Sequence, residues 1–366
     1  MKVVIIGAGV AGLSIGWRLR QSGVDVTVLE RAQPAQGATW ASAGMIAVTA
    51  EHEQAQSPEG ELAHRAQTMW PEFAREIEDA SGMTVGYAES GSLMVAMTDE
   101  QCVLHAKRAA ADSELKILSA ADTRAMEPML AENVTGALWA PKEAQVDNRA
   151  LGQALARAFV RTGGTLVLNE AVMRVEVHDD RAVAVLTPAG SYKADAFVLA
   201  AGAWSGLISG LPPAAVPPVK AMKGEMLALA PPKGTALPGH VVWGNDVYLV
   251  PRGGRLLVGA TLEDAGFDTG VTQAAEDRLS SRAVSVMPGL REWRIVEHWA
   301  GLRPGSPDGL PLLGPSAVRG LFIASGQYRN GILFAPAVAE ILSGLVLERP
   351  ADFAAFDPRR FSQALA

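Results

Sequence analysis

The alternation of apolar and polar residues near the N-terminus predicts a strand, a helix and a second strand. These elements are a β-branched run at residues 3–6, a stretch of helix-forming residues at 11–22 and an alternately apolar run at 24–29. Two parallel strands of one sheet require a crossover connection, which is usually a helix. We therefore predict a βαβ unit at the centre of a parallel sheet.

One more helix and a series of short strands are predicted for the middle of the chain. Residues 147–162 have apolar side chains at helical spacing, begin with an Asp-Asn pair suited to the N-cap and are followed by two glycines. Alternating runs separated by turn residues follow at 165–170, 171–178, 182–188 and 194–202. We expect these runs to form an antiparallel meander that returns to a central strand at residues 197–200.

Longer alternating runs begin at about residue 219 and predict an antiparallel sheet. They lie at residues 224–230, 240–243, 247–251, 255–261 and 293–299. A strand, a glycine-containing turn and a helix then return at 320–324, 326–331 and 335–347. Because the α/β pattern comes back, we predict two interleaved domains. One comprises residues 1–85, 142–218 and 299–366, and the other comprises residues 86–141 and 219–298.

Composition narrows the class of protein. With 49% hydrophobic and 19% charged residues, the chain of 366 residues is expected to be a soluble globular protein of about two domains. The net charge of −7 argues against nucleic acid and anionic membranes as partners, which leaves small molecules. An uncharged run at residues 196–219 is long enough to cross a bilayer. Its glycines and prolines instead predict a buried strand followed by a loop.

Cysteine and histidine usage indicates neither a disulfide nor a metal site. Cys102 is the only cysteine, which fits a reducing compartment, and we expect a cytoplasmic protein. The six histidines show no spacing typical of metal ligands. No bound metal is therefore predicted.

A glycine-rich turn supplies the clearest chemical signal. Gly7, Gly9 and Gly12 form the pattern G-x-G-x-x-G between the first predicted strand and helix, where a dinucleotide pyrophosphate can approach the backbone and the helix N-terminus. Glu30 follows the second strand, where its carboxylate can accept hydrogen bonds from ribose hydroxyls. An acidic residue at this position favours an unphosphorylated ribose, as in FAD or NAD.

Further segments resemble the amino-acid oxidase superfamily of FAD-dependent amine oxidoreductases (the D-amino acid oxidase-like enzymes), most closely the glycine oxidases of thiamine biosynthesis. The resemblance spans nearly the whole chain and rests on the fingerprint through Arg31, GATWASAGMIA at 37–47, VLAAGAWS at 198–205, YLVPR at 248–252, GLRPGSPDGLPLLG at 301–314 and GQYRNGILFAP at 326–336. It implies an α/β fold in which a Rossmann-like FAD-binding domain is interleaved with an antiparallel-sheet substrate domain.

The same resemblance implies which residues bind the cofactor. They are Gly7, Gly9, Val10, Ala11, Gly12, Glu30, Arg31, Thr39, Ser42, Ala43, Gly44, Met45, Val172, Ala201, Gly202, Arg303, Gly326, Arg329, Asn330, Gly331 and Ile332. The backbone of Val172 is expected to receive the adenine. The turn at 326–331 is expected beside the isoalloxazine ring, where N–H groups can stabilise negative charge on the reduced flavin.

Four residues are predicted to act at the substrate: Arg303, Tyr248, Arg329 and Met45. Arg303 is expected to follow a strand, and its guanidinium suits bidentate capture of a substrate carboxylate. The structural alternative is an ion pair of Arg303 with Asp308 or Glu297. For Tyr248 the alternative is a core role, and for Arg329 it is a surface salt bridge.

These assignments predict FAD-dependent oxidation of the C–N bond of glycine, sarcosine or a small D-amino acid to the imine and then the oxo acid. Oxygen is the expected electron acceptor and would be reduced to hydrogen peroxide. Three alternatives stay open. The first is a D-amino acid or proline-type dehydrogenase of the same superfamily that uses a quinone or another electron acceptor. The others are a non-catalytic flavoprotein subunit and an NAD-dependent dehydrogenase, which would be colourless. Because no cysteine follows Cys102, a thiol-linked flavin is not expected, and FAD should be non-covalent. The sequence allows a homo-oligomer and does not fix the oligomeric state.

Overall fold

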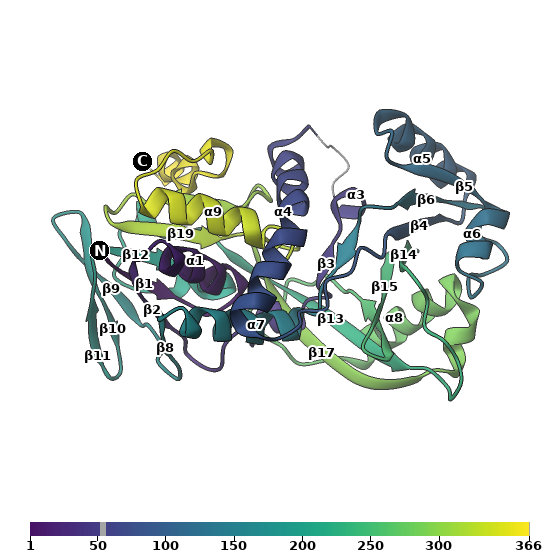
Figure 1. Cartoon of the computed structure of the whole chain (residues 1–366), viewed down its shortest axis with the longest axis horizontal. Helices are drawn as coiled ribbons and strands as arrows, with labels where there is room; N and C mark the ends of the chain where they lie inside the picture. Colours follow the sequence, from purple (N-terminus) through teal and green to yellow (C-terminus); the bar gives the residue numbers. More distant parts are fainter. Residues whose placement is uncertain (52–55, 366) are drawn as a thin grey trace.

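The computed structural model describes residues 1–51 and 56–365. Figure 1 shows two main sheets along the long axis of the molecule, with helices around each of them. The first is a six-stranded sheet in the order β18-β19-β12-β1-β2-β8. Its strands are β1 (Lys2–Ile6), β2 (Asp25–Leu29), β8 (Thr165–Val167), β12 (Ala196–Leu199), β18 (Leu312–Pro315) and β19 (Leu321–Ser325). All neighbours are parallel except β18 and β19.

The predicted βαβ unit is confirmed. Helix α1 (Val10–Gln21) connects β1 to β2, which pair in parallel from Lys2 with Asp25 to Ile6 with Leu29. Four helices share one face of this sheet: α1, α4 (Pro58–Ser81), α7 (Asn148–Arg161) and α9 (Ala335–Val346). Successive side chains of β1 point to opposite faces of the sheet, and Val3 and Ile5 point to the face that these helices cover.

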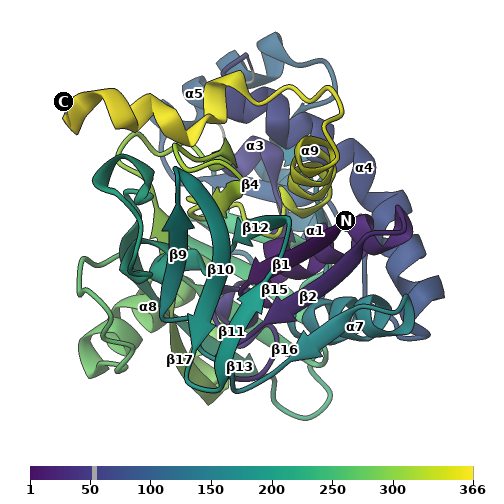
Figure 2. The same ribbon diagram turned by 90° about the vertical axis from the view of Figure 1, so that its left-hand side faces the viewer.

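The opposite face of the parallel sheet carries the predicted meander in a shorter form. It consists of β9 (Arg174–His178), β10 (Arg181–Thr187) and β11 (Gly190–Lys193). Figure 2 shows these strands in front of the parallel sheet, and Val4 and Ile6 of β1 share a buried cluster with Val175 and Val185 of the meander. One expectation was wrong: the run at 165–170 does not join the meander. It forms β8, parallel to β2, because α7 precedes it as a crossover helix.

The second sheet has eight strands in the order β17-β13-β16-β15-β14-β4-β6-β5. They are β4 (Ser92–Ala96), β5 (Lys116–Ser119), β6 (Gly136–Ala140), β13 (Lys220–Ala230), β14 (Val241–Gly244), β15 (Val247–Arg252), β16 (Arg255–Gly259) and β17 (Arg294–Gly305). Helix α8 (Gln273–Val286) packs on one face with Leu227 and Leu229 of β13. The other face presents Met226, Tyr248 and Trp299. Neighbouring strands of this sheet are antiparallel except β4 and β14, which pair in parallel. The predicted α/β class is therefore confirmed, with one mainly parallel and one mainly antiparallel sheet.

The remaining elements are short or lie at the edges of the sheets. The α-helices and strands among them are α2 (Ala38–Ala41), β3 (Met45–Ile46), α3 (Val48–Glu51), α5 (Asp99–Ala111), α6 (Ala120–Met126) and β7 (Ala144–Gln145), and short 3₁₀ helices lie at Pro288–Glu292, Ala354–Phe356 and Pro358–Leu365. Residues 196–219 form β12 and two 3₁₀ helices, and no helix within the described residues is long and apolar enough to cross a membrane. The strand β17 continues across the predicted domain boundary at residues 298 and 299 and ends at Gly305. The domain boundaries stay a prediction.

Candidate active site

A cavity of about 480 Å³ lies between the carboxyl ends of the parallel strands and the antiparallel sheet. Ile6 and Leu29 line it from the first sheet, together with Ala200 directly after β12, and Gly224 and Tyr248 line it from the second. Ligands of open parallel sheets bind at this end of the strands. The fold therefore places the cavity where a dinucleotide and a second, smaller molecule can meet.

All but two of the predicted site residues line this cavity, and the exceptions are Gly12 and Gly326. A Cβ added at Gly12 would lie 2.0 Å from the carbonyl oxygen of Gly7, so this glycine lets the turn pack on the helix. Gly326 has a φ of +74°, and an added Cβ would lie 3.0 Å from Cγ of Leu312. Both glycines therefore have a packing role in the structure, and their contact with the cofactor stays a prediction.

The first end of the cavity is built around the N-terminus of α1. Gly9 is its N-cap, and a Cβ added there would meet only Oγ1 of Thr39, at 3.6 Å. The N–H of Val10 donates to the same Thr39 oxygen at 3.0 Å. The backbone at Gly9 is thus open to the cavity, as a bound pyrophosphate requires.

Glu30 closes this end from β2. Its Oε2 accepts the N–H of Ala8 at 2.8 Å, and its Oε1 accepts the N–H of Ala32 at 3.1 Å. These bonds fix the carboxylate on the cavity wall while each oxygen keeps further acceptor capacity for ribose hydroxyls. Arg31 lies beside it, with its guanidinium 3.6 Å from the centroid of the Trp204 ring.

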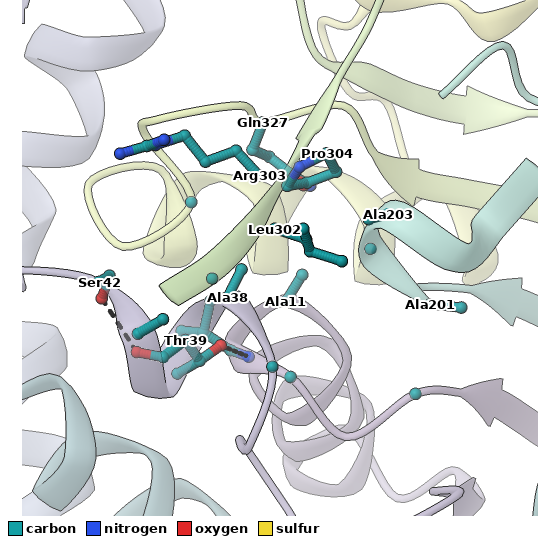
Figure 3. Close-up of a pocket in the computed structure, with 18 of the residues that line it drawn as sticks. Ala11, Ala38, Thr39, Ser42, Ala201, Ala203, Leu302, Arg303, Pro304 and Gln327 are labelled. Atoms are coloured by element: carbon teal, nitrogen blue, oxygen red, sulfur yellow. Dashed lines mark hydrogen bonds between the residues drawn. The ribbon is translucent and has the colours of Figure 1, made fainter. Parts of the chain in front are cut away.

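The segment from Ala38 to Gly44 leads to the second end, and all of its residues except Trp40 are small and line the cavity. Figure 3 shows Ala11, Ala38 and Thr39 facing Leu302 and Arg303 across the cavity. Nδ2 of Asn148 donates to the carbonyl oxygens of Thr39 and Trp40, each at 2.8 Å, which holds this segment against α7. Short side chains on a fixed backbone allow a flat ring system to approach closely.

Arg303 occupies the second end of the cavity. It was expected to follow a strand, but it lies inside β17, because the pairing with β13 continues to Gly305 opposite Lys220. Its Nη1 donates to the carbonyl oxygen of Thr261 at 3.1 Å, and a Cβ added at Gly224 would lie 2.0 Å from that nitrogen. Gly224 therefore leaves the space that the guanidinium occupies.

The structural alternative for Arg303 is wrong. Asp308 binds Nε of Arg360 at 2.8 Å, and Glu297 binds Nη2 of Arg149 at 2.6 Å. Both carboxylates are thus engaged by other arginines, and Arg303 lies on the cavity wall.

Tyr248 lies on the same wall, on β15, and is 7% exposed. Burial raises the pKa of its hydroxyl, and the neighbouring positive charge of Arg303 lowers it in part. The hydroxyl therefore stays protonated at neutral pH and can donate a hydrogen bond to a carboxylate held by Arg303. Tyr248 belongs to a buried cluster and also lines the cavity, so its place in the core is compatible with a role at the substrate, which stays a prediction.

Glu51 is a cavity residue that the sequence analysis did not identify. Its Oε2 lies 3.0 Å from Nε of Arg329, and its side chain is 9% exposed. Burial raises the pKa of Glu51, while the charges of Arg329 and Arg303 lower it in part. The alternative considered for Arg329 was a surface salt bridge. Arg329 does form a salt bridge, but its partner is a carboxylate that lines the cavity. No motif surrounds Glu51, and only the fold brings it to Arg329.

The single cysteine lies away from this cavity. Cys102 is on α5, and its Sγ is 3.3 Å from Oγ1 of Thr135. It is not among the residues that line the cavity. Within the described residues, no group of three or more His, Cys, Asp or Glu side chains could hold a metal ion.

Comparison with known proteins gives a consistent result. Residues 2–345 match the family model described as FAD dependent oxidoreductase. The chain is 37% identical to the bifunctional protein ThiO/ThiG of Synechocystis over 98% of its own length and 54% of that protein, so it spans about half of this relative. It is 34% identical to the glycine oxidase of Pseudomonas aeruginosa over 95% of each chain.

Solved structures show the same similarity. The crystal structure of glycine oxidase from Geobacillus kaustophilus superposes with a TM-score of 0.90 and 32% identity over 97% of each chain. The iminodiacetate oxidase of Chelativorans superposes with a TM-score of 0.87 and 28% identity, over 97% of this chain and 98% of that one.

Proposed function

Because the chain belongs to the family of FAD-dependent oxidoreductases, we propose that it holds FAD non-covalently and oxidises glycine or another small amino acid with oxygen as the electron acceptor. The observation that carries this proposal is the continuity of one cavity. Gly9 and Glu30 line one end of it, and Arg303, Tyr248 and Arg329 line the other. A cofactor bound at the first end would therefore reach a molecule held at the second.

The residues present fit FAD. The open backbone at Gly9 and the N-terminus of α1 would hold the pyrophosphate, and Glu30 would hold the ribose. Val172 lines the cavity and would contact the adenine, while Ser42 and Asn330 would lie near the ring system. FAD, when bound, would supply a two-electron acceptor for the C–N bond and pass the electrons to oxygen, which gives hydrogen peroxide.

Arg303 and Tyr248 would bind and orient the substrate carboxylate. A guanidinium can donate two parallel hydrogen bonds to a carboxylate, and the protonated Tyr248 hydroxyl can donate a third. The ion pair of Glu51 with Arg329 adds no net charge, so among the described residues that line this end Arg303 supplies the remaining positive charge. The single carboxylate of an amino-acid substrate would neutralise the positive charge of Arg303. Orientation of the α-carbon by these contacts is the main contribution of the chain to catalysis.

The proposed reaction yields an imine, which water hydrolyses to an oxo acid and ammonia, or to a primary amine when the substrate is N-methylated. Conversion of the amine to the imine removes two electrons and two protons from the substrate. Oxygen takes up the two electrons and two protons and becomes hydrogen peroxide. Glycine, sarcosine and small D-amino acids are the proposed substrates, because each presents one carboxylate to Arg303. The names of the similar enzymes support glycine itself.

Three measurements on the purified protein test this proposal. We expect a yellow protein whose FAD is released on acid precipitation, because Cys102 is remote from the cavity. We expect anaerobic bleaching of the flavin by glycine, sarcosine, D-alanine or D-proline, and oxygen consumption with the same substrate. Bleaching without oxygen consumption would identify a dehydrogenase. A yellow protein that no amino acid bleaches would contradict the proposed oxidation.

A further inference from the structure

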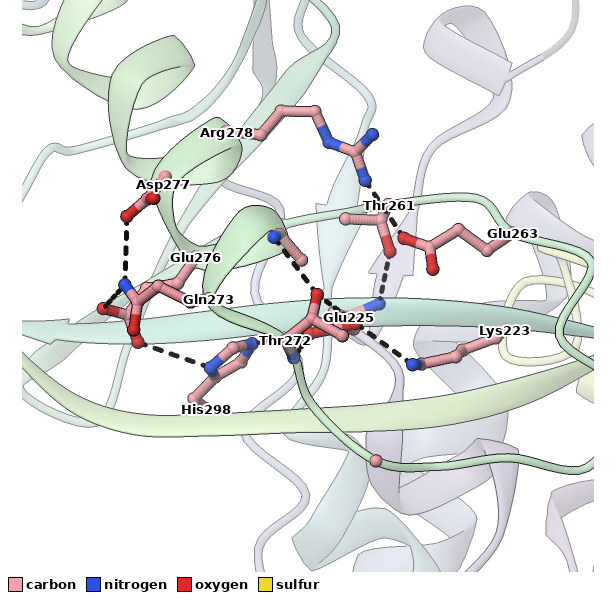
Figure 4. Close-up of polar contacts among 12 residues, drawn as sticks. Lys223, Glu225, Thr261, Glu263, Thr272, Gln273, Glu276, Asp277, Arg278 and His298 are labelled. Carbon is pink, nitrogen blue, oxygen red and sulfur yellow. Dashed lines mark hydrogen bonds and ion pairs between the residues drawn. The ribbon is translucent and has the colours of Figure 1, made fainter.

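A buried polar cluster lies behind Arg303, on the opposite face of β13. Lys223 is 1% exposed and Glu225 is 0% exposed, and they alternate along the strand with Gly224 and Met226, which line the cavity. Figure 4 shows Lys223, Glu225 and His298 together with Thr261 and Thr272. Farther along β13, the same face packs apolar residues against α8, so the cluster interrupts an apolar layer.

Glu225 is the centre of this cluster, and both of its oxygens are occupied. Its Oε1 accepts from Nζ of Lys223 at 3.1 Å and from the hydroxyl of Thr272 at 3.2 Å. Its Oε2 accepts from the N–H of Thr272 at 2.9 Å and contacts Nε2 of His298 at 2.8 Å. Burial raises the pKa of Glu225, but these bonds outweigh burial and hold it below its usual value.

Further charged groups surround the cluster. Nδ1 of His298 lies 3.4 Å from Oε2 of Glu276, and Nζ of Lys223 lies 3.9 Å from Oδ2 of Asp268. Lys223 also exchanges two backbone hydrogen bonds with Glu263, each at 2.9 Å. The cluster thus fastens the segment between β16 and α8 to β13 at both ends.

A short chain of hydrogen bonds joins this cluster to Arg303. The N–H of Glu225 donates to the hydroxyl of Thr261 at 2.8 Å, and the N–H of Thr261 donates to the carbonyl oxygen of Glu225 at 3.1 Å. The carbonyl oxygen of Thr261 in turn accepts from Nη1 of Arg303 at 3.1 Å. Thr261 is therefore fixed on one side by Glu225 and holds the guanidinium on the other.

A buried ion pair is weak evidence for stability, because apolar residues of similar volume often stabilise a fold as well or better. Its value in a binding site is geometric, since bidentate capture of a carboxylate depends on the orientation of the guanidinium. We propose that Lys223, Glu225 and His298 are positioning residues that hold the Thr261 carbonyl, and through it Arg303, in the orientation that binds the substrate carboxylate. This inference rests on the proposed function, because it assigns the carboxylate to Arg303.

A matched pair of substitutions at Thr261 tests the link. Thr261→Val removes the hydroxyl that accepts the N–H of Glu225 and keeps the shape, whereas Thr261→Ser keeps the hydroxyl. In the FAD-loaded enzyme we expect Thr261→Val to raise the KM for glycine and the Kd of glycolate by about fivefold, the effect of one hydrogen bond. The value of kcat and the FAD content should stay within about twofold of the parent. Thr261→Ser should bind glycolate as the parent does.

A second pair tests the charge of the cluster. Glu225→Gln keeps the size of the side chain and removes the charge that binds Lys223 and His298, and it should raise the Kd of glycolate by about tenfold or more. Arg278→Gln is the control, because Arg278 binds Glu263 of the same segment through a pair that is partly exposed, at 47% and 33%. This control should leave glycolate binding unchanged.

The Thr261 pair tests only the link through the backbone of Glu225, so a variant of a cluster side chain is needed if Glu225→Gln does not fold. In that case His298→Gln, which removes the imidazole that contacts Oε2 of Glu225, should weaken glycolate binding in the same assay. Parent-like glycolate binding by a folded His298→Gln protein would overturn the role of the cluster.

Arg303→Ala in the same assay separates the two proposals. If Arg303→Ala binds glycolate as the parent does, Arg303 does not hold the carboxylate, and both the assignment of the clamp and this inference fail. If Arg303→Ala weakens binding while Thr261→Val and Glu225→Gln match the parent, the clamp stands and the positioning role is overturned. A loss of FAD or an equal loss of kcat in Thr261→Val would also overturn it, because a general structural defect would then explain the change.

Discussion

The carboxylate of Glu51 binds Nε of Arg329 at 3.0 Å, and the two side chains differ sharply in exposure, at 9% and 42%. The carboxylate therefore lies on the inner side of the pair and the guanidinium on the outer side. Glu51 and Arg329 line the same cavity as Arg303. The protonation state of Glu51 therefore changes the net charge that surrounds an anionic ligand at this end of the cavity. For the three described charged residues at this end, Glu51, Arg303 and Arg329, the net charge is that of one guanidinium when Glu51 is ionised and that of two when Glu51 is neutral.

Glycolate, which has the carboxylate of glycine but no amine, should report this charge directly. Since the pKa of Glu51 is raised by burial, lowering the pH protonates it while Arg303 and Arg329 stay charged. We expect glycolate to bind several-fold more tightly as the pH falls through the raised pKa. Glu51→Gln should bind tightly at all pH values in that range. Identical pH profiles of glycolate binding in the parent and Glu51→Gln would show that Glu51 does not act on the ligand.

Arg303→Ala tests the proposed reaction. Loss of one charge-assisted interaction costs about 1.5–3 kcal/mol, so kcat/KM for glycine should fall by roughly 10- to 150-fold with little change in the flavin spectrum. Arg303→Lys should recover only part of the loss, because an ammonium lacks the planar fork. Turnover by Arg303→Ala within about threefold of the parent, less than about 0.7 kcal/mol, would require another residue to hold the carboxylate, and Arg329 is the next candidate.

Gly224→Ala should disturb the same contact without removing a charge. The added Cβ would lie 2.0 Å from Nη1 of Arg303, the end of a flexible side chain, so the guanidinium must move while the strand stays intact. We expect a higher KM for glycine and unchanged FAD content. Gly289→Ala is the control, because nothing lies within 4 Å of a Cβ added there. Equal KM values in Gly224→Ala and the parent would mean that the guanidinium position is not critical.

Gly9→Val and Gly12→Val should fail in different ways. A side chain at Gly9 has only Oγ1 of Thr39 nearby, at 3.6 Å, so the protein should fold but lose FAD, whose pyrophosphate would occupy the same space. A side chain at Gly12 would meet the Gly7 carbonyl oxygen at 2.0 Å and should prevent folding or lower its yield. Thermal unfolding and the flavin-to-protein absorbance ratio distinguish the two. A folded Gly9→Val protein with full FAD would contradict the assigned phosphate turn.

The features that the sequence predicts well are those with a local cause. Gly7, Gly9 and Glu30 belong to one continuous βαβ unit, so their spacing alone places them around the N-terminus of α1. The same holds for the apolar alternation in β1, which fixes the faces toward the helices and the meander. Strand pairing is less local, and the position of β8 depends on the crossover through α7 rather than on its own residues.

The features that the sequence does not predict depend on distant segments. Glu51 and Arg329 are far apart in the chain, and neither carries a signal that names the other. Glu225 and Lys223 read as polar interruptions of a strand, and only the pairing of β13 with β17 brings His298 to them. The motif identifies Arg303, but the sequence could not show that Asp308 and Glu297 pair with other arginines, because those arginines lie far from both carboxylates in the chain.

Glu143 is a buried carboxyl group whose ionisation should make the stability of the fold depend on pH. It is 1% exposed, lies next to β7, and its Oε1 accepts the N–H of Ala50 in α3 at 3.0 Å. Burial raises the pKa of Glu143 to about 7, and hydrogen bonds from Ser92 and from backbone N–H groups lower it in part. The carboxyl group that supports α3, the helix that carries Glu51, is therefore neutral below about pH 7.

This pKa predicts the direction of a change in stability. Between pH 4.5 and about 7 the folded state keeps a proton that the unfolded state releases, so the free energy of unfolding falls as the pH rises, by up to about 3 kcal/mol from this group. Glu143→Gln keeps the acceptor for Ala50 and cannot ionise. Urea unfolding of the FAD-loaded protein at pH 5, 6, 7 and 8 should show a flatter dependence in this variant and greater stability than the parent at pH 8. Glu132→Gln, a change at an exposed glutamate, should follow the parent, and a parent-like slope in Glu143→Gln would show that the buried carboxyl group already ionises near its ordinary pKa.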